Sequence, residues 1–155
     1  MRTTPLDDRD RAILDLLQDD GRLTNVELAE RVNLSPSACH RRVRLLEESG
    51  LIAGTVTLLD QEVCGKPGTA FVEIKLERQD RQALDAFEAM VAKVPEVLDC
   101  YLVAGPSDYL IRTIFADAAE FERIHTEILT CLPGVVRVET VFALRTVKRT
   151  TRIPL

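Results

Sequence analysis

The sequence of 155 residues contains no run of eighteen apolar residues and no apolar stretch after its first four residues. A transmembrane helix needs about 20 consecutive apolar residues, and a secretory signal needs an apolar core near the N-terminus. We therefore expect a soluble, cytoplasmic protein that has no membrane partner. The length is sufficient for two small domains, each with its own hydrophobic core.

Residues that support catalysis or metal binding are also scarce. The four cysteines lie 25 to 36 residues apart, whereas the cysteine pairs of zinc and redox sites stand a few residues apart. The two histidines, His40 and His125, are distant in the chain, and neither a phosphate-binding loop nor a Gly-x-Ser-x-Gly motif occurs. The sequence therefore predicts no catalytic residues, no metal site, no cofactor and no enzyme.

Positive charge is concentrated in two segments, although the chain has 25 acidic and 20 basic residues and a formal charge of -5. Residues 37–46 contain Arg41, Arg42 and Arg44 and no acidic residue. Residues 142–155 also contain basic residues and no acidic one. A nucleic acid responds to the local surface charge rather than to the charge of the whole chain. The acidic total therefore does not exclude DNA as a partner.

Three short helices are predicted within the first fifty residues. Asp7 and the acids that follow it precede an apolar stripe that ends at Gly21, which indicates the first helix. Residues 24–27, Thr-Asn-Val-Glu, form a capping box for a second helix, and Ser35-Pro36 begins a third that stops at Gly50. The second helix is expected to bury Val26, Leu28, Ala29 and Val32. The third is expected to bury Val43, Leu45 and Leu46.

The short connection between the second and third helices is typical of a helix-turn-helix, whose last helix lies in the major groove of DNA. Ser37, His40, Arg41 and Arg44 stand three and four residues apart, so they share the face opposite the leucines. Arginine at such positions binds phosphates or the guanine edge. The alternative interpretation is a solvated basic face on a small helical bundle.

At this point the chain resembles the Lrp/AsnC family of transcriptional regulators. The residues that carry the resemblance are Leu6-Asp7-Asp8-Arg9-Asp10, Ile13-Leu14, Leu17-Gln18-Asp19-Asp20-Gly21-Arg22, Asn25-Val26-Glu27-Leu28-Ala29, Leu34-Ser35-Pro36 and Arg41-Arg42-Val43-Arg44-Leu45-Leu46-Glu47. The resemblance implies a winged-type helix-turn-helix domain over residues 1–60, with its reading unit at 25–44. The DNA contacts that it implies are Ser35, Ser37, His40, Arg41, Arg42 and Arg44.

The rest of the chain predicts a second domain. Residues 51–58 alternate like a strand, residues 61–68 form a linker, and residues 69–155 follow the ferredoxin-like order βαββαβ. The fold class is therefore α+β. The expected strands are 70–76, 97–104, 109–115 and 135–144, with helices over 80–94 and 118–132. Both helices cover one face of the sheet, and the abundance of valine and isoleucine suggests that a second copy of the chain buries the other.

Residues 105–109, Gly-Pro-Ser-Asp-Tyr, form the turn on which a ligand site would depend. The same resemblance continues here, at residues 97–103, 105–110, 132–135 and 145–148, and implies a cleft between neighbouring dimers in which Asp108 accepts from the ammonium group of an amino acid. The effector-binding residues that it implies are Gly105, Ser107, Asp108 and Tyr109, with Gly134, Val135, Thr140 and Phe142 as further candidates. The alternative is a plain hairpin in which Asp108 bonds to the backbone.

The sequence as a whole therefore predicts a regulator of amino-acid metabolism whose assembly or DNA affinity responds to an amino-acid effector. Its expected partners are a pseudo-palindromic double-stranded DNA operator, other copies of itself as a dimer that assembles to a tetramer or octamer, and the small ligand. Such a protein is cytoplasmic and nucleoid-associated. A DNA-binding architectural protein that ignores metabolites is the alternative, and a thermal-shift screen of the twenty amino acids separates the two.

Overall fold

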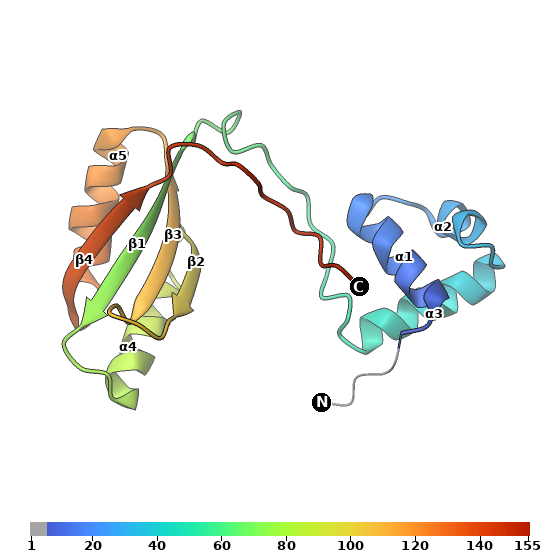
Figure 1. Cartoon of the computed structure of the whole chain (residues 1–155), viewed down its shortest axis with the longest axis horizontal. Helices are drawn as coiled ribbons and strands as arrows, with labels where there is room; N and C mark the ends of the chain where they lie inside the picture. The colour runs from blue at the N-terminus through green and yellow to red at the C-terminus, as the bar shows by residue number, and fades with distance from the viewer. Residues whose placement is uncertain (1–5) are drawn as a thin grey trace. The chain divides into compact units, whose positions relative to one another are not determined.

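The computed structural model describes residues 6–155, and the chain divides into two units (Figure 1). The helical unit holds the residues up to Leu58 together with Lys148–Leu155, and the sheet unit holds Leu59–Val147. Residues 1–4, where the sequence predicts no apolar signal segment, lie outside the described residues. None of the helices in residues 6–155 is long and apolar enough to span a membrane.

The helical unit contains α1 (Asp8–Asp19), α2 (Asn25–Arg31) and α3 (Pro36–Glu48). The predicted capping box is present at α2, where Thr24 and Glu27 accept from each other's backbone N–H groups. The starts of α2 and α3 are linked, because the side-chain amide of Asn25 donates to the carbonyl of Pro36 at 2.8 Å. The core consists of Ile13, Leu14, Leu28, Ala29, Val32, Cys39 and Leu46.

Three expectations for this unit were wrong. Val26 is 55% exposed because it stands in the first turn of α2, outside the buried cluster, and Leu45 is 50% exposed because it is one helical step from the buried Leu46. The strand expected over residues 51–58, all of which the structure describes, is absent. An alternating pattern forms a strand only when another strand pairs with it, and this segment has none.

The C-terminal segment Lys148–Leu155 belongs to the helical unit, whereas the sequence placed it in the second domain. Arg152 forms ion pairs with Asp15, at 3.0 Å, and with Asp19. Gln18 accepts from the backbone N–H of Ile153 at 2.6 Å and donates to its carbonyl at 3.1 Å. The basic tail is therefore attached to the acidic side of α1.

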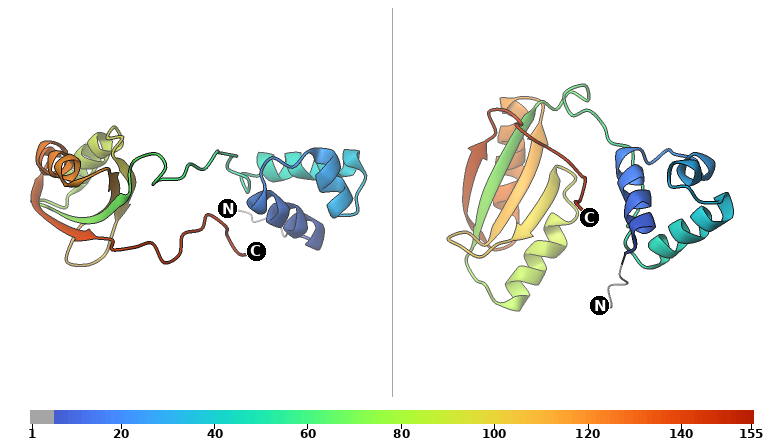
Figure 2. Two further views of the ribbon diagram at one scale, coloured as in Figure 1. Left: turned by 90° about the horizontal axis from the view of Figure 1, so that it is seen from above. Right: turned by 45° about the vertical axis from the view of Figure 1, so that its right-hand side comes forward.

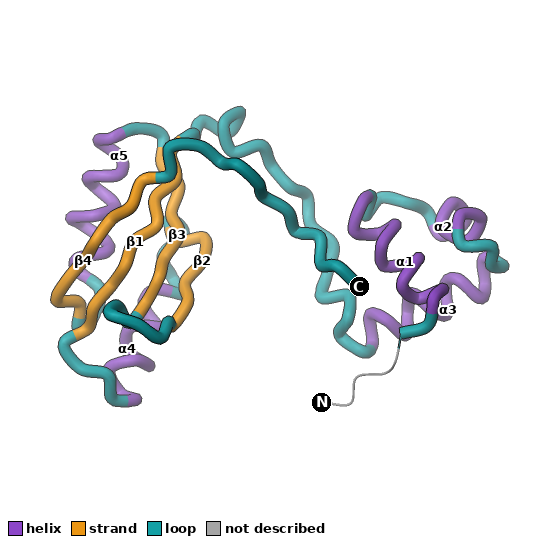
Figure 3. The backbone as a smooth tube through the Cα atoms, in the orientation of Figure 1, coloured by secondary structure: helices purple, strands orange, loops and turns teal. Residues whose placement is uncertain are grey.

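The sheet unit has the ferredoxin-like arrangement that the sequence predicts. Its strands are β1 (Gly68–Leu76), β2 (Val97–Leu102), β3 (Tyr109–Phe115) and β4 (Val135–Phe142), and every pairing in the order β2-β3-β1-β4 is antiparallel. The helix α4 (Arg81–Val91) follows β1. Figure 3 shows these four strands in orange.

The second helix of this unit changes its hydrogen-bonding pattern along its length. It begins as α5 (Ala118–Arg123), continues as a π-helix at Ile124–Ile128 and ends as a 3-10 turn at Leu129–Cys131. The sequence predicted one regular helix over 118–132, because the spacing of apolar residues does not distinguish these patterns. His125 lies in the π-helical segment, half-buried near the ring of Phe121.

Both helices lie on the same side of the sheet, as Figure 2 shows. The core lies between the sheet and these helices. It is formed by one side of β1 and β3 and by residues of the helices, among them Val72, Ile74, Phe87, Ile111 and Ile124. Within residues 59–147, all of which the structure describes, no element covers the other side of the sheet. We call this side the open face.

The open face combines apolar and charged side chains. From the strand register, its residues are Phe71, Glu73, Lys75, Asp99, Tyr101, Leu110, Arg112, Ile114, Arg137, Glu139 and Val141. Phe71, Tyr101 and Val141 are 38%, 57% and 57% exposed. Arg112 and Asp99 form an ion pair across neighbouring strands. This surface is not fully polar, and no element of residues 59–147 covers it.

Candidate functional site

The helix α3 carries the basic surface that the sequence singles out. Ser35 is its N-cap, since its hydroxyl accepts from the N–H of Ala38 at 3.3 Å, and Pro36 occupies the first helical position. Ser37 lies beside it, with the two serine hydroxyls 3.2 Å apart. The start of α3 is therefore exposed and carries two serine hydroxyls that can form hydrogen bonds.

The exposed side of α3 presents His40, Arg41 and Arg44 to solvent. In the part of the chain that the structure describes, the side chains of Arg41 and His40 form no hydrogen bond or ion pair. Arg44 pairs with Glu48, one turn further along, at 2.7 Å, and both side chains are more than half exposed. An exposed pair of this kind contributes little free energy, so Arg44 can exchange its partner for a phosphate.

Arg42 differs from its neighbours, although the sequence grouped it with them as a DNA contact. Its guanidinium lies 2.8 Å from a carboxylate oxygen of Asp7 and 2.7 Å from one of Asp10, and its side chain is 26% exposed. The N–H of Asp10, followed by the Arg42 guanidinium, holds the pKa of Asp7 below its ordinary value. The structure thus directs Arg42 toward α1 and away from the exposed side of α3.

Asp108 is buried within the chain, contrary to the expectation that it faces a ligand. One carboxylate oxygen accepts from the backbone N–H of Leu76 at 2.8 Å. The other accepts from the ammonium of Lys75 at 3.1 Å and from the side-chain amide of Gln79 at 2.8 Å. Only 8% of the side chain is exposed. The geometry corresponds to the alternative interpretation, in which Asp108 holds the turn to the backbone of β1.

Tyr109 is also part of the core. Its side chain is 1% exposed and stacks on Phe87 with ring centroids 4.3 Å apart. Its hydroxyl donates to Glu88 at 2.8 Å. Burial, together with this carboxylate, raises the pKa of Tyr109. The tyrosine therefore positions the end of the turn against α4.

Ser107 and Pro106, by contrast, line a hollow of about 280 Å³ on the open face. The hydroxyl of Ser107 donates to Glu73 at 2.6 Å. The other lining residues are all charged, and they are Glu73, Lys75, Arg137 and Glu139. Sequence reasoning missed the four charged residues of this hollow. The available signal was the alternation of charged and apolar residues along β1 and β4, because charges at every second position mark one face.

The other predicted ligand residues are divided between the two ends of the sheet. Gly134 has a φ of 73° in the turn before β4, and its carbonyl accepts from the N–H of Glu77, at the end of β1 where Asp108 also binds. Thr140 and Phe142 pair with Val72 and Ala70, nearer the other end.

Phe142 packs on Phe115 and Phe121, on the helix side of the sheet. Val135 starts β4 opposite Leu76. One protomer therefore brings residues 105–109 and 134–135 to the same end of the sheet, and it does not bring Thr140 and Phe142 there. The resemblance implies a cleft shared between copies, in which residues from both ends can meet.

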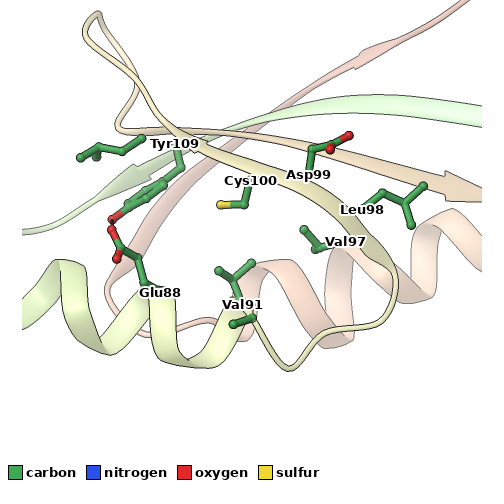
Figure 4. Close-up of a pocket in the computed structure, with 9 residues that line it drawn as sticks. Glu88, Val91, Val97, Leu98, Asp99, Cys100 and Tyr109 are labelled. Atoms are coloured by element: carbon green, nitrogen blue, oxygen red, sulfur yellow. Dashed lines mark hydrogen bonds between the residues drawn. The ribbon is translucent and has the colours of Figure 1, made fainter. Parts of the chain in front are cut away.

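A second hollow, of about 470 Å³, lies between α4 and the edge strand β2 (Figure 4). Glu88, Asp99, Cys100 and Tyr109 are its polar lining residues. Burial raises the pKa of the Cys100 thiol to about 11, with a smaller contribution from Glu88. A thiol with that pKa is protonated at neutral pH and is a poor nucleophile. Within residues 6–155, no cluster of three or more histidine, cysteine or acidic residues could hold a metal ion.

Comparisons with known protein families match both units. The family model described as winged helix-turn-helix DNA-binding matches residues 6–53, and the model described as Lrp/AsnC ligand binding domain matches residues 69–153. The leucine-responsive regulatory protein of Salmonella typhimurium is 41% identical over 148 residues, which are 96% of this chain and 90% of that protein. The protein of the same name in Escherichia coli is 40% identical over the same length.

Solved structures give the same result. A transcriptional regulator from Neisseria meningitidis, in complex with L-Met, is 40% identical, covers 97% of each chain and superposes with a TM-score of 0.92. An AsnC family transcriptional regulator from Agrobacterium tumefaciens is 34% identical, covers 96% of this chain and 97% of its own, and has a TM-score of 0.91.

Proposed function

The chain belongs to the Lrp/AsnC family and is a DNA-binding transcriptional regulator, and from that premise we propose that an amino acid controls its assembly or its DNA affinity. The genes that it controls would then be those of amino-acid metabolism, and it would act on chromosomal DNA in the cytoplasm. Two similar proteins support an amino acid as the effector, since one is called a leucine-responsive regulatory protein and the structure of the other contains L-Met.

The observation that carries this proposal is the hollow beside Ser107. It presents two carboxylates, Glu73 and Glu139, and two cationic side chains, Lys75 and Arg137. A free amino acid carries an ammonium and a carboxylate within a few ångströms of each other, so paired charges of both signs complement it. The exposed backbone near Gly105 can approach such a ligand closely.

The DNA-binding surface that we propose is the exposed side of α3, with Ser35, Ser37, His40, Arg41 and Arg44. A dimer would place two copies of α3 in successive major grooves of a pseudo-palindromic operator. The apolar residues of the open face are the surface that we propose for the dimer, and larger assemblies would follow from it. Effector binding then shifts an equilibrium between assemblies, through a difference in its affinity for them.

We predict that Arg41→Ala weakens operator binding by about 1 to 3 kcal/mol, because a base or phosphate contact is lost. If Arg41 contacts a phosphate, the slope of log affinity against log salt also falls by about one for each contact removed. Fluorescence anisotropy over a salt series measures both. Arg81→Ala is the control, since Arg81 is 94% exposed on α4 in the sheet unit. Equal affinity of wild type and Arg41→Ala at every salt concentration would refute this surface.

We predict that one or a few of the twenty amino acids raise the melting temperature of the protein, and that Ser107→Ala reduces this shift. Ser107 lines the hollow and contributes one hydroxyl, so its removal costs roughly 0.5 to 1.5 kcal/mol of ligand affinity, or about two- to tenfold. Thr146→Ala, at an exposed position of the same unit, is the control. If no amino acid shifts the melting temperature, the effector-free architectural protein is the better description.

A further inference from the structure

Asp7 and Asp10 at the start of α1 use one carboxylate oxygen each for the capping box and the other for a hydrogen bond from Arg42. One oxygen of Asp7 accepts from the N–H of Asp10 at 2.8 Å, and one oxygen of Asp10 accepts from the N–H of Asp7 at 3.4 Å. These two bonds form the capping box of α1. The remaining oxygen of each residue accepts from the same nitrogen of Arg42, at 2.8 and 2.7 Å. All four oxygens therefore have a protein partner.

The contact joins residues that are far apart in the sequence. Arg42 lies in the middle of α3, and its partners precede it by 35 and 32 positions. The side chains of Arg42 and Asp10 are 26% and 19% exposed, so water screens this pair less than the ion pairs at the surface. Arg42 would lose its hydrogen bonds to both carboxylates if its guanidinium turned toward a phosphate.

We infer that Arg42 is a positioning residue, which holds the recognition helix α3 on the capped start of α1, and that Arg41 is left to contact DNA. The inference rests on the DNA-binding surface proposed for α3 and deepens it, because it divides two adjacent arginines by role. Arg41 is exposed and has no partner among the described residues. The angle of about 100° between successive residues of a helix directs the two side chains to different surroundings.

The test compares Arg42→Ala with Arg41→Ala in the full-length chain. For Arg42→Ala we expect operator affinity to fall by the same factor at every salt concentration, with the wild-type salt slope. The backbone amides of α1 and α3 should then exchange hydrogen faster, because the link between the helices is lost. For Arg41→Ala we expect wild-type exchange and a smaller salt slope, as for a phosphate contact, or weaker and less specific binding, as for a base contact.

A double-mutant cycle with Asp10→Asn identifies the partner. Asparagine keeps an oxygen for the capping box but removes one of the two charges that Arg42 contacts, so Arg42→Ala should change hydrogen exchange less in that background than in the wild type. A reduced salt slope in Arg42→Ala with unchanged exchange would show that Arg42 binds phosphate, and would overturn the inference. Additive effects in the cycle would also overturn it. Failure of the DNA surface itself is distinguishable, because Arg41→Ala would then bind normally while the exchange cycle still reports on Arg42.

Discussion

Replacing Asp108 with alanine will lower the free energy of unfolding of the sheet unit by about 2 to 4 kcal/mol, since a buried donor left without its partner costs about 1 to 3 kcal/mol and a partly buried charge loses its counter-charge. The N–H of Leu76 and the ammonium of Lys75 are the groups that lose their acceptor. For a unit of this size the melting temperature should fall by roughly 10 °C or more. Urea denaturation measures the change.

The matched control is Asp85→Ala, which removes the same side chain from a position on α4. Asp85 is 67% exposed and its ion pair with Arg81 is long, at 3.7 Å, so its loss should change stability by less than about 0.5 kcal/mol. Equal stability of the two variants would contradict the structural role of Asp108. The sequence resemblance implies that Asp108 faces a ligand, whereas the structure engages its carboxylate with the N–H of Leu76 and leaves 8% of its side chain exposed. Ser107, rather than Asp108, is therefore the residue with which to test the ligand site.

Replacing Leu110 with glutamate will dissociate the proposed dimer and weaken operator binding by about a hundredfold or more, because two tethered reading helices gain affinity through effective concentration. Leu110 lies at the centre of the open face, between Glu73 of β1 and Tyr101 of β2. A carboxylate there would be removed from water whenever two open faces meet, which is unfavourable.

Sedimentation velocity measures the assembly, and anisotropy measures the affinity. Met90→Glu is the control, because Met90 is an apolar residue that is 45% exposed on α4 and lies off the open face. We expect that control to assemble and to bind DNA as the wild type does. A Leu110→Glu protein that keeps the wild-type mass would exclude the open face as the dimer interface.

Local signals in the sequence were sufficient wherever a structure depends on neighbouring residues. The capping box of Thr24 and Glu27 and the Ser35-Pro36 start of α3 are as predicted, since each requires residues at most three positions apart. The order of strands and helices in the sheet unit followed from alternating and helical patterns in the same way.

Contacts between distant residues could not be predicted in this way. Arg41 and Arg42 are chemically identical neighbours, and only the folded position of Asp10, 32 residues earlier, separates them. In the sequence, Asp108 looks like an ordinary turn residue. Its structural role depends on the N–H of Leu76, also 32 residues earlier, which lies next to its carboxylate only in the folded chain. Site residues predicted from spacing alone are therefore least certain where their partners belong to another element.

The attachment of Lys148–Leu155 to α1 also determines how early in synthesis the helical unit can be completed. The ribosome synthesises the whole sheet unit between the two parts of the helical unit, so α1 leaves the exit tunnel long before Arg152 does. Domains generally fold as they emerge, but the helical unit cannot form its ion pairs with Asp15 and Asp19 until the second unit has been synthesised. A fragment that stops at residue 60 therefore lacks part of its own domain.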